Sequence, residues 1–399
     1  RGLSVAYEKV GNVQMAQGNL AGALKSYRED LAIAERLAQS DPGNADWQDD
    51  LSVAYENVGD VQVAQGKLAD ALTSYQADLA IMERLAQSDP GNGGWQRDLS
   101  VPYEKVGNVQ VAQGDLAGAL KSYRLSLAIA ERLAQSDPGN AGWQRDLSVA
   151  YEKVGNVQVA QGDLAGALKS YQAFLAIVKR LAQSDPGNAG WQRDLSVSYE
   201  KVGDVQVAQG KLADALASYQ ASLAIREWLA KSDPGNAGWQ DDLSVAYDNV
   251  GDVQVAQGKL ADALASYQAS LAIAERLAQS DPGNGGWQRD LSVSYIKVGD
   301  VQVAQGKLAD ALTSYQASLA IRERLVQSDP GNAGWQRDLA VSYAKLADVY
   351  RRSNEPDQAR AALRQGHAIM DRLTKLSPGN ADWKNDLSWF NAQIAALTK

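Results

Sequence analysis

The sequence predicts an all-α solenoid of antiparallel helix hairpins, because two residue types recur with one common period. Eight of the ten prolines and eight of the ten tryptophans each stand 48 residues apart. The prolines are Pro42, Pro90, Pro138, Pro186, Pro234, Pro282, Pro330 and Pro378, and the tryptophans are Trp47, Trp95, Trp143, Trp191, Trp239, Trp287, Trp335 and Trp383. A period of this length indicates stacked structural repeats, each of which contacts only its neighbours.

One unit, residues 140–187, shows how each hairpin is encoded. Asn140 follows a Pro-Gly turn and is suited to cap a first helix, helix A, which we expect over residues 141–161. Gly162 ends helix A, and a second helix, helix B, is expected over residues 164–183. Both helices carry an apolar stripe at 3–4 spacing, so neither can bury its apolar face alone. Pairing A with B, and stacking on the next hairpin, would cover these stripes.

The period divides the chain into eight repeats over residues 1–380 and a C-terminal capping helix over residues 381–399. The first repeat is truncated at its N-terminus, because Arg1-Gly2-Leu3 matches the middle of a repeat. The chain also lacks an initiator methionine, so we expect an excised fragment of a longer protein.

Composition excludes several classes of function. The net charge of −9 argues against a nucleic-acid partner, and no run of about 18 apolar residues could span a membrane. The chain has no cysteine and a single histidine, His367, so neither a metal site nor a histidine-based triad can be assembled. We therefore expect no catalytic residues, no metal and no cofactor. The once-per-repeat tryptophans are interpreted as core residues.

The residues of each hairpin resemble the tetratricopeptide repeat family. In the unit above, the positions that carry the resemblance are Tyr151, Val154-Gly155, Gly162, Ala167 and Tyr171, and equivalent residues recur in seven successive copies. The likeness is to a long-helix, 48-residue variant found in bacterial multidomain proteins. It implies a right-handed superhelix whose helices A line the concave surface, and we expect a cytoplasmic protein.

The chain departs from the family pattern in two ways. The second aromatic residue of helix A is a glutamine, as at Gln158, and the period is 48 rather than 34 residues. The additional 14 residues divide into about two extra turns per helix, which preserve the inward face. Gly155, inside helix A, is expected to allow a close approach of helix B opposite a small residue such as Ala167. The eighth copy has Ala347 there, which predicts slightly looser packing.

A row of acidic and amide residues is the candidate partner-binding site. These residues stand four apart on helix A and face one way, on the surface that the resemblance makes concave. They are Glu56, Asp60, Glu104, Asn108, Glu152, Asn156, Glu200, Asp204, Asp248 and Asp252. The row is interpreted either as a solvated face with intrahelical ion pairs or as a groove for a basic or amide-rich extended segment.

Variation between copies is concentrated on helix B. Phe174 and Val178 form a local apolar pair on its variable row, and Trp228 interrupts a position that is otherwise arginine. These three residues are the candidates for a specific lateral contact. The leading hypothesis is a non-enzymatic protein–protein interaction scaffold, with a partner protein or peptide docked on the helix-A surface. The alternative is a structural spacer or self-associating rod in a larger multidomain protein, because the near-identical repeats also suit self-association.

Overall fold

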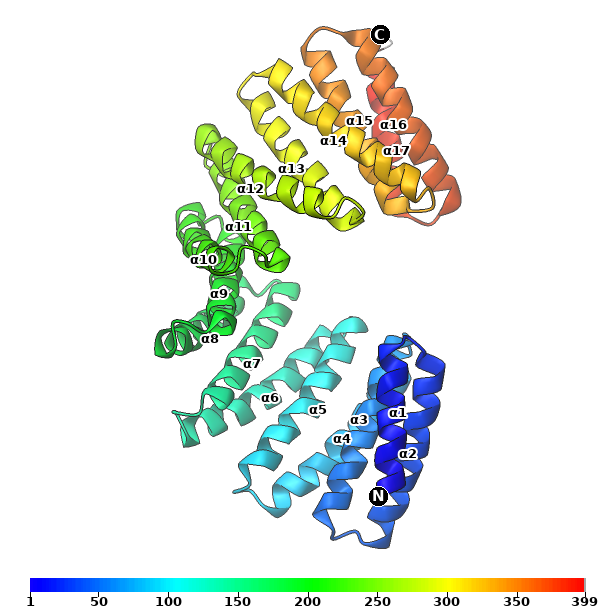
Figure 1. Cartoon of the computed structure of the whole chain (residues 1–399), viewed down its shortest axis with the longest axis vertical. Coiled ribbons are helices and arrows are strands. Elements are labelled where there is room, and N and C mark those ends of the chain that lie inside the picture. Colours follow the sequence, from blue (N-terminus) through cyan, green and yellow to red (C-terminus); the bar gives the residue numbers. More distant parts are fainter. Residues whose placement is uncertain (398–399) are drawn as a thin grey trace. The chain divides into compact units, whose positions relative to one another are not determined.

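The computed structural model describes residues 1–397 of the chain. These residues form seventeen α-helices and no strand. They divide into two compact units, residues 1–209 and residues 210–399, each of which is described by itself. Within each unit, close packing joins helices that are consecutive in the chain, and successive hairpins lie side by side (Figure 1). The prediction of an all-α solenoid of helix hairpins is confirmed, while its superhelical handedness stays a prediction.

Helices A carry odd numbers and helices B carry even numbers. The first unit contains α1 (Gly2–Ala16), α2 (Leu20–Ser40), α3 (Ala45–Ala64), α4 (Leu68–Ser88), α5 (Gly93–Ala112), α6 (Leu116–Ser136), α7 (Ala141–Ala160), α8 (Leu164–Ser184) and α9 (Ala189–Ala208). The second unit contains α10 (Leu212–Ser232), α11 (Ala237–Ala256), α12 (Leu260–Ser280), α13 (Gly285–Ala304), α14 (Leu308–Ser328), α15 (Ala333–Arg352), α16 (Pro356–Leu376) and α17 (Ala381–Ala396).

Local sequence signals set the helix ends. The Asn140 side chain accepts a hydrogen bond from the Trp143 backbone N–H at 3.1 Å, as predicted for a helix N-cap. Asp163 caps α8 in the same way through the Gly166 N–H at 2.9 Å. Between α7 and α8 the backbone reverses at Gly162, whose φ of +79° is readily adopted only without a side chain. The eighth copy uses Asn354 at φ +61°, a residue that tolerates this region.

The glycine inside helix A makes room for an aromatic ring. A Cβ on Gly155 would lie 2.5 Å from the ring of Tyr171 in α8, and the same tyrosine position meets the glycine in six of the first seven hairpins. The prediction that Ala167 lies opposite the glycine was therefore wrong, because the ring is the nearest group. Where α15 has Ala347 instead, α16 has Leu363 in place of the tyrosine, and both are buried.

The glutamine that replaces the family's second aromatic residue has a partner on helix B. Ser170 donates a hydrogen bond to Gln158 at 2.7 Å, and both side chains are buried. Equivalent serine–glutamine bonds link α1 to α2 and α13 to α14. A buried hydrogen-bonded pair thus stands where family members pack an aromatic side chain, which satisfies both polar groups.

Successive hairpins are joined by hydrogen bonds at a fixed spacing. Tyr151 in α7 donates to Glu131 in α6 at 2.6 Å, and burial together with this carboxylate raises the pKa of Tyr151 to about 12. The series recurs at five other junctions. It is interrupted at Tyr199, because Lys179 stands where the other repeats have an acidic residue.

The last helix packs on α15 and α16. Phe390 of α17 is buried, and a methyl group on Gly366 of α16 would collide with its ring. Trp383, Leu387 and Ile394 pack against the same core. We propose that α17 caps the array of eight repeats; residues 398 and 399 of the expected capping segment lie outside the described residues.

Candidate docking surface on helices A

The predicted acidic row lies on helix A, but the next repeat engages it. In the first unit Lys105 of α5 bonds Asp60 of α3 at 2.7 Å and lies 3.1 Å from Glu56. In the second unit Lys297 of α13 is 2.8 Å from Asp252 of α11. These contacts join neighbouring helices A. The interpretation of this face as one with intrahelical pairs was therefore wrong at these junctions.

Tyrosines of helix B donate hydrogen bonds to acidic and amide residues of the same row. Tyr75 donates to Asp60 at 2.5 Å, and Tyr123 donates to Asn108 at 2.7 Å. Burial raises the pKa of Tyr123 to about 12, so this hydroxyl remains a donor throughout the physiological range. Asn156 receives the equivalent bond in α7 at 2.7 Å. The row is therefore partly an internal hydrogen-bonding system.

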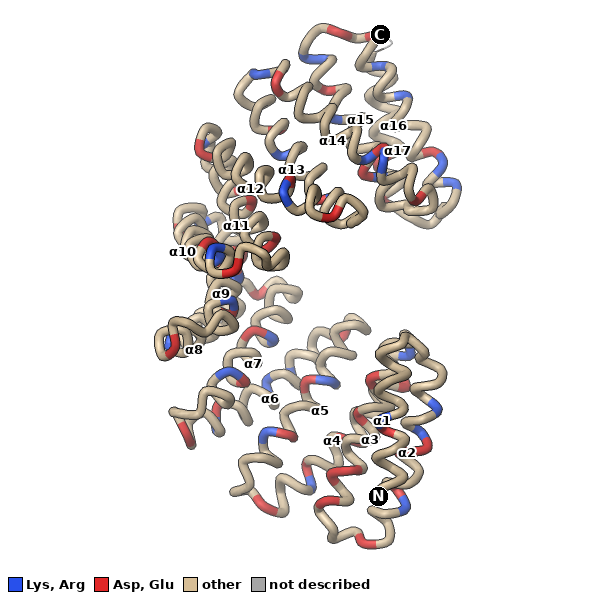
Figure 2. Tube along the Cα trace, in the orientation of Figure 1, with Lys and Arg blue, Asp and Glu red and all other residues tan. Residues whose placement is uncertain are grey.

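Half-burial shifts the pKa values of charged residues in the row. Burial raises the pKa of Glu104, against the hydrogen bond from Ser126 and the nearby charge of Lys153. Burial alone would lower the pKa of Lys105, but its carboxylate neighbours raise it. Figure 2 shows acidic and basic positions interspersed along the helices. The net field of the row is consequently weaker than the sequence pattern suggests.

The remaining predicted residues occupy equivalent places. Asp248 of α11 is half-buried, burial raises its pKa, and Lys297 lies 3.6 Å from it. Glu152 of α7 and Glu200 of α9 are half-buried, and Asp204 is exposed. The structure thus places all ten predicted residues on one face of the helices A.

Valines flank this row at both ends, and those near the C-terminal ends of the helices A are exposed, which the sequence analysis did not predict. In α7 the positions Val149, Glu152, Asn156 and Val159 follow 3–4–3 spacing, so they share one helix face. Val159 is 41% exposed, and its equivalents Val63, Val111, Val207 and Val255 are similarly exposed. The 48-residue period of these valines is visible in the sequence, but a branched apolar residue on a helix is normally interpreted as a core residue.

A second set of ion pairs lies at the N-terminal ends of the helices A. Arg97 is 2.5 Å from Asp146 of the next repeat, and Arg289 is 2.6 Å from Asp338. Most of these arginines remain about half exposed, so each pair contributes little to stability. Each of these pairs joins residues 49 positions apart, so the same register recurs between adjacent helices A.

Two of the three residues predicted for a lateral contact are buried. Phe174 and Val178 of α8 are buried, so a partner cannot reach them, and this prediction was wrong for both. Each fills the core where other repeats have a smaller or different side chain. Trp228 of α10, by contrast, is 43% exposed.

The described residues show no arrangement suited to a metal ion. No set of three or more histidine or acidic side chains there is arranged to hold a metal ion. His367 is half-buried and its Nε2 lies 2.9 Å from the Asn391 side-chain oxygen. No helix within residues 1–397 is both long and apolar enough to cross a membrane.

Comparison with known proteins identifies the class. A family model described as tetratricopeptide repeat matches residues 340–365, which span the end of α15 and the start of α16. Residues 340–365 match a tetratricopeptide repeat, and the same residue pattern recurs in the other hairpins. Such repeat arrays are commonly non-catalytic scaffolds for protein interaction. No curated protein matches the chain in sequence.

Two solved structures show the same fold. The crystal structure of BtubC (BKLC) from P. vanneervenii is 19% identical with a TM-score of 0.50, and the match covers 66% of this chain and 93% of that one. The apo form of RapI is 12% identical with a TM-score of 0.53, over 94% of this chain and 99% of that one. At these identities the similarity concerns the fold alone.

Proposed function

We propose that this chain is a non-enzymatic protein–protein interaction scaffold that docks a partner protein or peptide on its helix-A surface. The observation that carries the proposal is the repeated exposure of valines such as Val63, Val111 and Val159 beside a polar row. Exposed apolar side chains aligned over successive elements are typical of interaction surfaces. The partner segment is extended, because the valines recur once per repeat along the stack.

The polar row between the valines would orient the partner. Asp60, Asn108 and Asn156 already accept hydrogen bonds from tyrosines, so their geometry is fixed before binding. Glu152 is half-buried on the same face and favours a basic residue in the partner. A shallow cavity of about 230 Å³ lies on this face in the first unit, lined by residues that include Val63, Lys105 and Asn108.

Substitution of the exposed valines should abolish docking. We expect the triple variant Val63→Asp, Val111→Asp and Val159→Asp to lose at least tenfold in affinity, because three apolar contacts are replaced by charges. Partners are first captured from an extract of the source organism, and the affinity of each purified partner is then measured by isothermal titration calorimetry.

A matched control places the same charges on helix B. The variant Ala80→Asp, Ala128→Asp and Ala176→Asp alters exposed positions of α4, α6 and α8. It should keep wild-type affinity and a wild-type circular dichroism spectrum. Equal affinity of both triple variants for every captured partner would show that the helix-A surface is not the docking site.

A further inference from the structure

The helix-A face of α15 and α17 lacks two charged residues that the earlier repeats have. Helix α15 has Ala344 where α3, α5, α7 and α9 have glutamate, and α17 has Gln393 where the preceding helices A mostly have lysine. The lysine–carboxylate contact that covers this face elsewhere is therefore lost between α15 and α17. Trp389 of α17 occupies the position that corresponds to Val149 of α7 and Val341 of α15, and it is 44% exposed.

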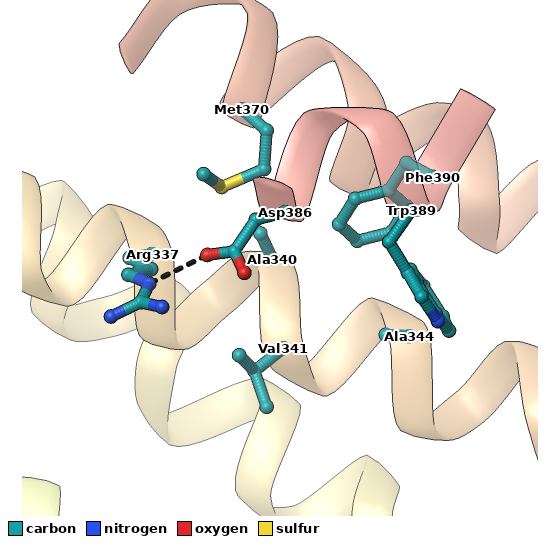
Figure 3. Close-up of a pocket in the computed structure, with 8 residues that line it drawn as sticks. All are labelled: Arg337, Ala340, Val341, Ala344, Met370, Asp386, Trp389 and Phe390. Carbon is teal, nitrogen blue, oxygen red and sulfur yellow. Dashed lines mark hydrogen bonds and ion pairs between the residues drawn. The ribbon is translucent and has the colours of Figure 1, made fainter. Parts of the chain in front are cut away.

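Two cavities lie on either side of the Trp389 side chain. The first, of about 270 Å³, is lined by residues that include Val341, Ala344 and Phe390 (Figure 3). The second, of about 220 Å³, is lined by Ala344, Trp389 and other residues. Both are smaller than the roughly 300–1,000 Å³ of small-molecule sites, so each suits one bulky side chain.

The indole of Trp389 packs against the ring of Phe390. Its ring centroid lies 5.0 Å from that of Phe390, at an interplanar angle of 85°. Phe390 is itself buried, as described above, so the exposed ring rests on a fixed support. An anchored, half-exposed tryptophan between two cavities is the arrangement of an interface hot spot.

The charges at the two ends of this surface differ. At the first cavity Arg337 is 2.7 Å from Asp386, so this pair is balanced (Figure 3). Arg351 lines the second cavity and bonds the carboxylate of Asp348 at 2.6 Å, and Arg352, beside the cavity, bonds the same carboxylate at 2.7 Å. Among residues 1–397, these two arginines share one carboxylate, which leaves an excess of positive charge beside the cavity. An occupant with complementary charge carries an acidic group next to the second cavity.

We propose that the surface between α15 and α17 binds an extended peptide segment with two bulky apolar side chains and an acidic residue. The apolar side chains occupy the cavities on either side of Trp389, and the acidic residue contacts Arg351 and Arg352. This proposal rests on the proposed scaffold function and assigns the partner chemistry for the helix-A face of the second unit.

Selection from a phage-displayed library of random peptides tests the proposal. We expect selected peptides to share two bulky apolar residues and an acidic residue. Their affinity should fall at least tenfold in Trp389→Ala and also in the variant Arg351→Gln with Arg352→Gln, measured by isothermal titration calorimetry. The control Trp228→Ala removes an equally exposed tryptophan from α10 and should leave affinity unchanged.

A second variant distinguishes loss of binding from loss of folding. Ala344→Glu restores the residue of the earlier repeats, fills both cavities and should also cost at least tenfold in affinity. Selected peptides that bind all these variants equally, or that lack the expected chemistry, would overturn the proposal. A dimer in sedimentation velocity that is lost in Trp389→Ala would also overturn it, because a second copy would then occupy the surface.

Failure here is distinguishable from failure of the scaffold function. Peptides that bind through Val63, Val111 and Val159, and not through Trp389, would leave the scaffold proposal standing and remove this one. The scaffold proposal fails only if substituting those valines leaves the captured partners bound.

Discussion

Replacing Gly155 with alanine is expected to lower the free energy of unfolding by about 1–3 kcal/mol, although alanine is the better helix former. The added methyl group would lie 2.5 Å from the ring of Tyr171, which is buried and donates a hydrogen bond to Asn156. The ring cannot move away without losing that bond and its packing. Urea denaturation followed by circular dichroism measures the loss.

The eighth repeat supplies the compensating change. Adding Tyr171→Leu to Gly155→Ala copies the natural pair Ala347 and Leu363, so the double variant should be more stable than the sum of the single effects predicts. Ala347→Gly is the matched control and should destabilise, since no ring fills the vacated space. Strictly additive single effects would show that the glycine and the tyrosine are not coupled.

Replacing Asp78 with serine should stabilise the chain increasingly as the pH rises. Asp78 in α4 is 1% exposed, and its Oδ2 atom has no hydrogen-bond partner within the described residues. Burial raises its pKa to about 7 from the ordinary 3.8, against the hydrogen bond from Ser52. Four other repeats have serine at this position: Ser126, Ser222, Ser270 and Ser318.

The sign follows from proton binding. The folded state holds the Asp78 proton more tightly than the unfolded chain, so this group is harmless below about pH 4 and costs stability as the pH rises toward 7. At roughly 1.4 kcal/mol per pKa unit the cost above pH 7 is at most about 4 kcal/mol.

Urea midpoints at pH 4.5, 6 and 8 measure the stability gain of Asp78→Ser over wild type, and we expect that gain to grow with pH. The isosteric control Asp78→Asn keeps the shape of the side chain and removes its titration. It should show the same pH trend. A stability difference from wild type that is constant across the three pH values would mean that Asp78 does not titrate in this range.

The hairpin architecture was predictable because its signals are local and repeated. The Pro-Gly turns, the capping residue Asn140 and the left-handed position at Gly162 each fix a helix end within a few residues. Periodicity then gives the stacking, because identical neighbours must use the same contacts. The partners of Gly155 and Gln158 were not predictable, since a ring and a hydroxyl on helix B are recognised as complementary only once A and B are docked.

The candidate site was predicted less completely than the fold. Sequence spacing placed Glu56 and Asp60 on one face, but the contact with Lys105 joins residues about 45 positions apart and depends on the distance between helices A. Phe174 was misassigned because one helix face contacts several neighbours, and periodicity alone does not say which face stays open. Trp389 was missed for a similar reason, because a tryptophan on an amphipathic helix is normally interpreted as core.

Deletion of residues 140–187 tests the central claim most directly, namely that 48-residue hairpins are stabilised by contacts with their neighbours. The deletion brings Tyr199 to the position of Tyr151, where it can donate to Glu131, and Arg97 meets Asp194 in place of Asp146. We predict a folded chain with undiminished helicity per residue and a cooperative thermal transition by circular dichroism. A chain that is unfolded, or that has lost helicity beyond the removed residues, would contradict the account.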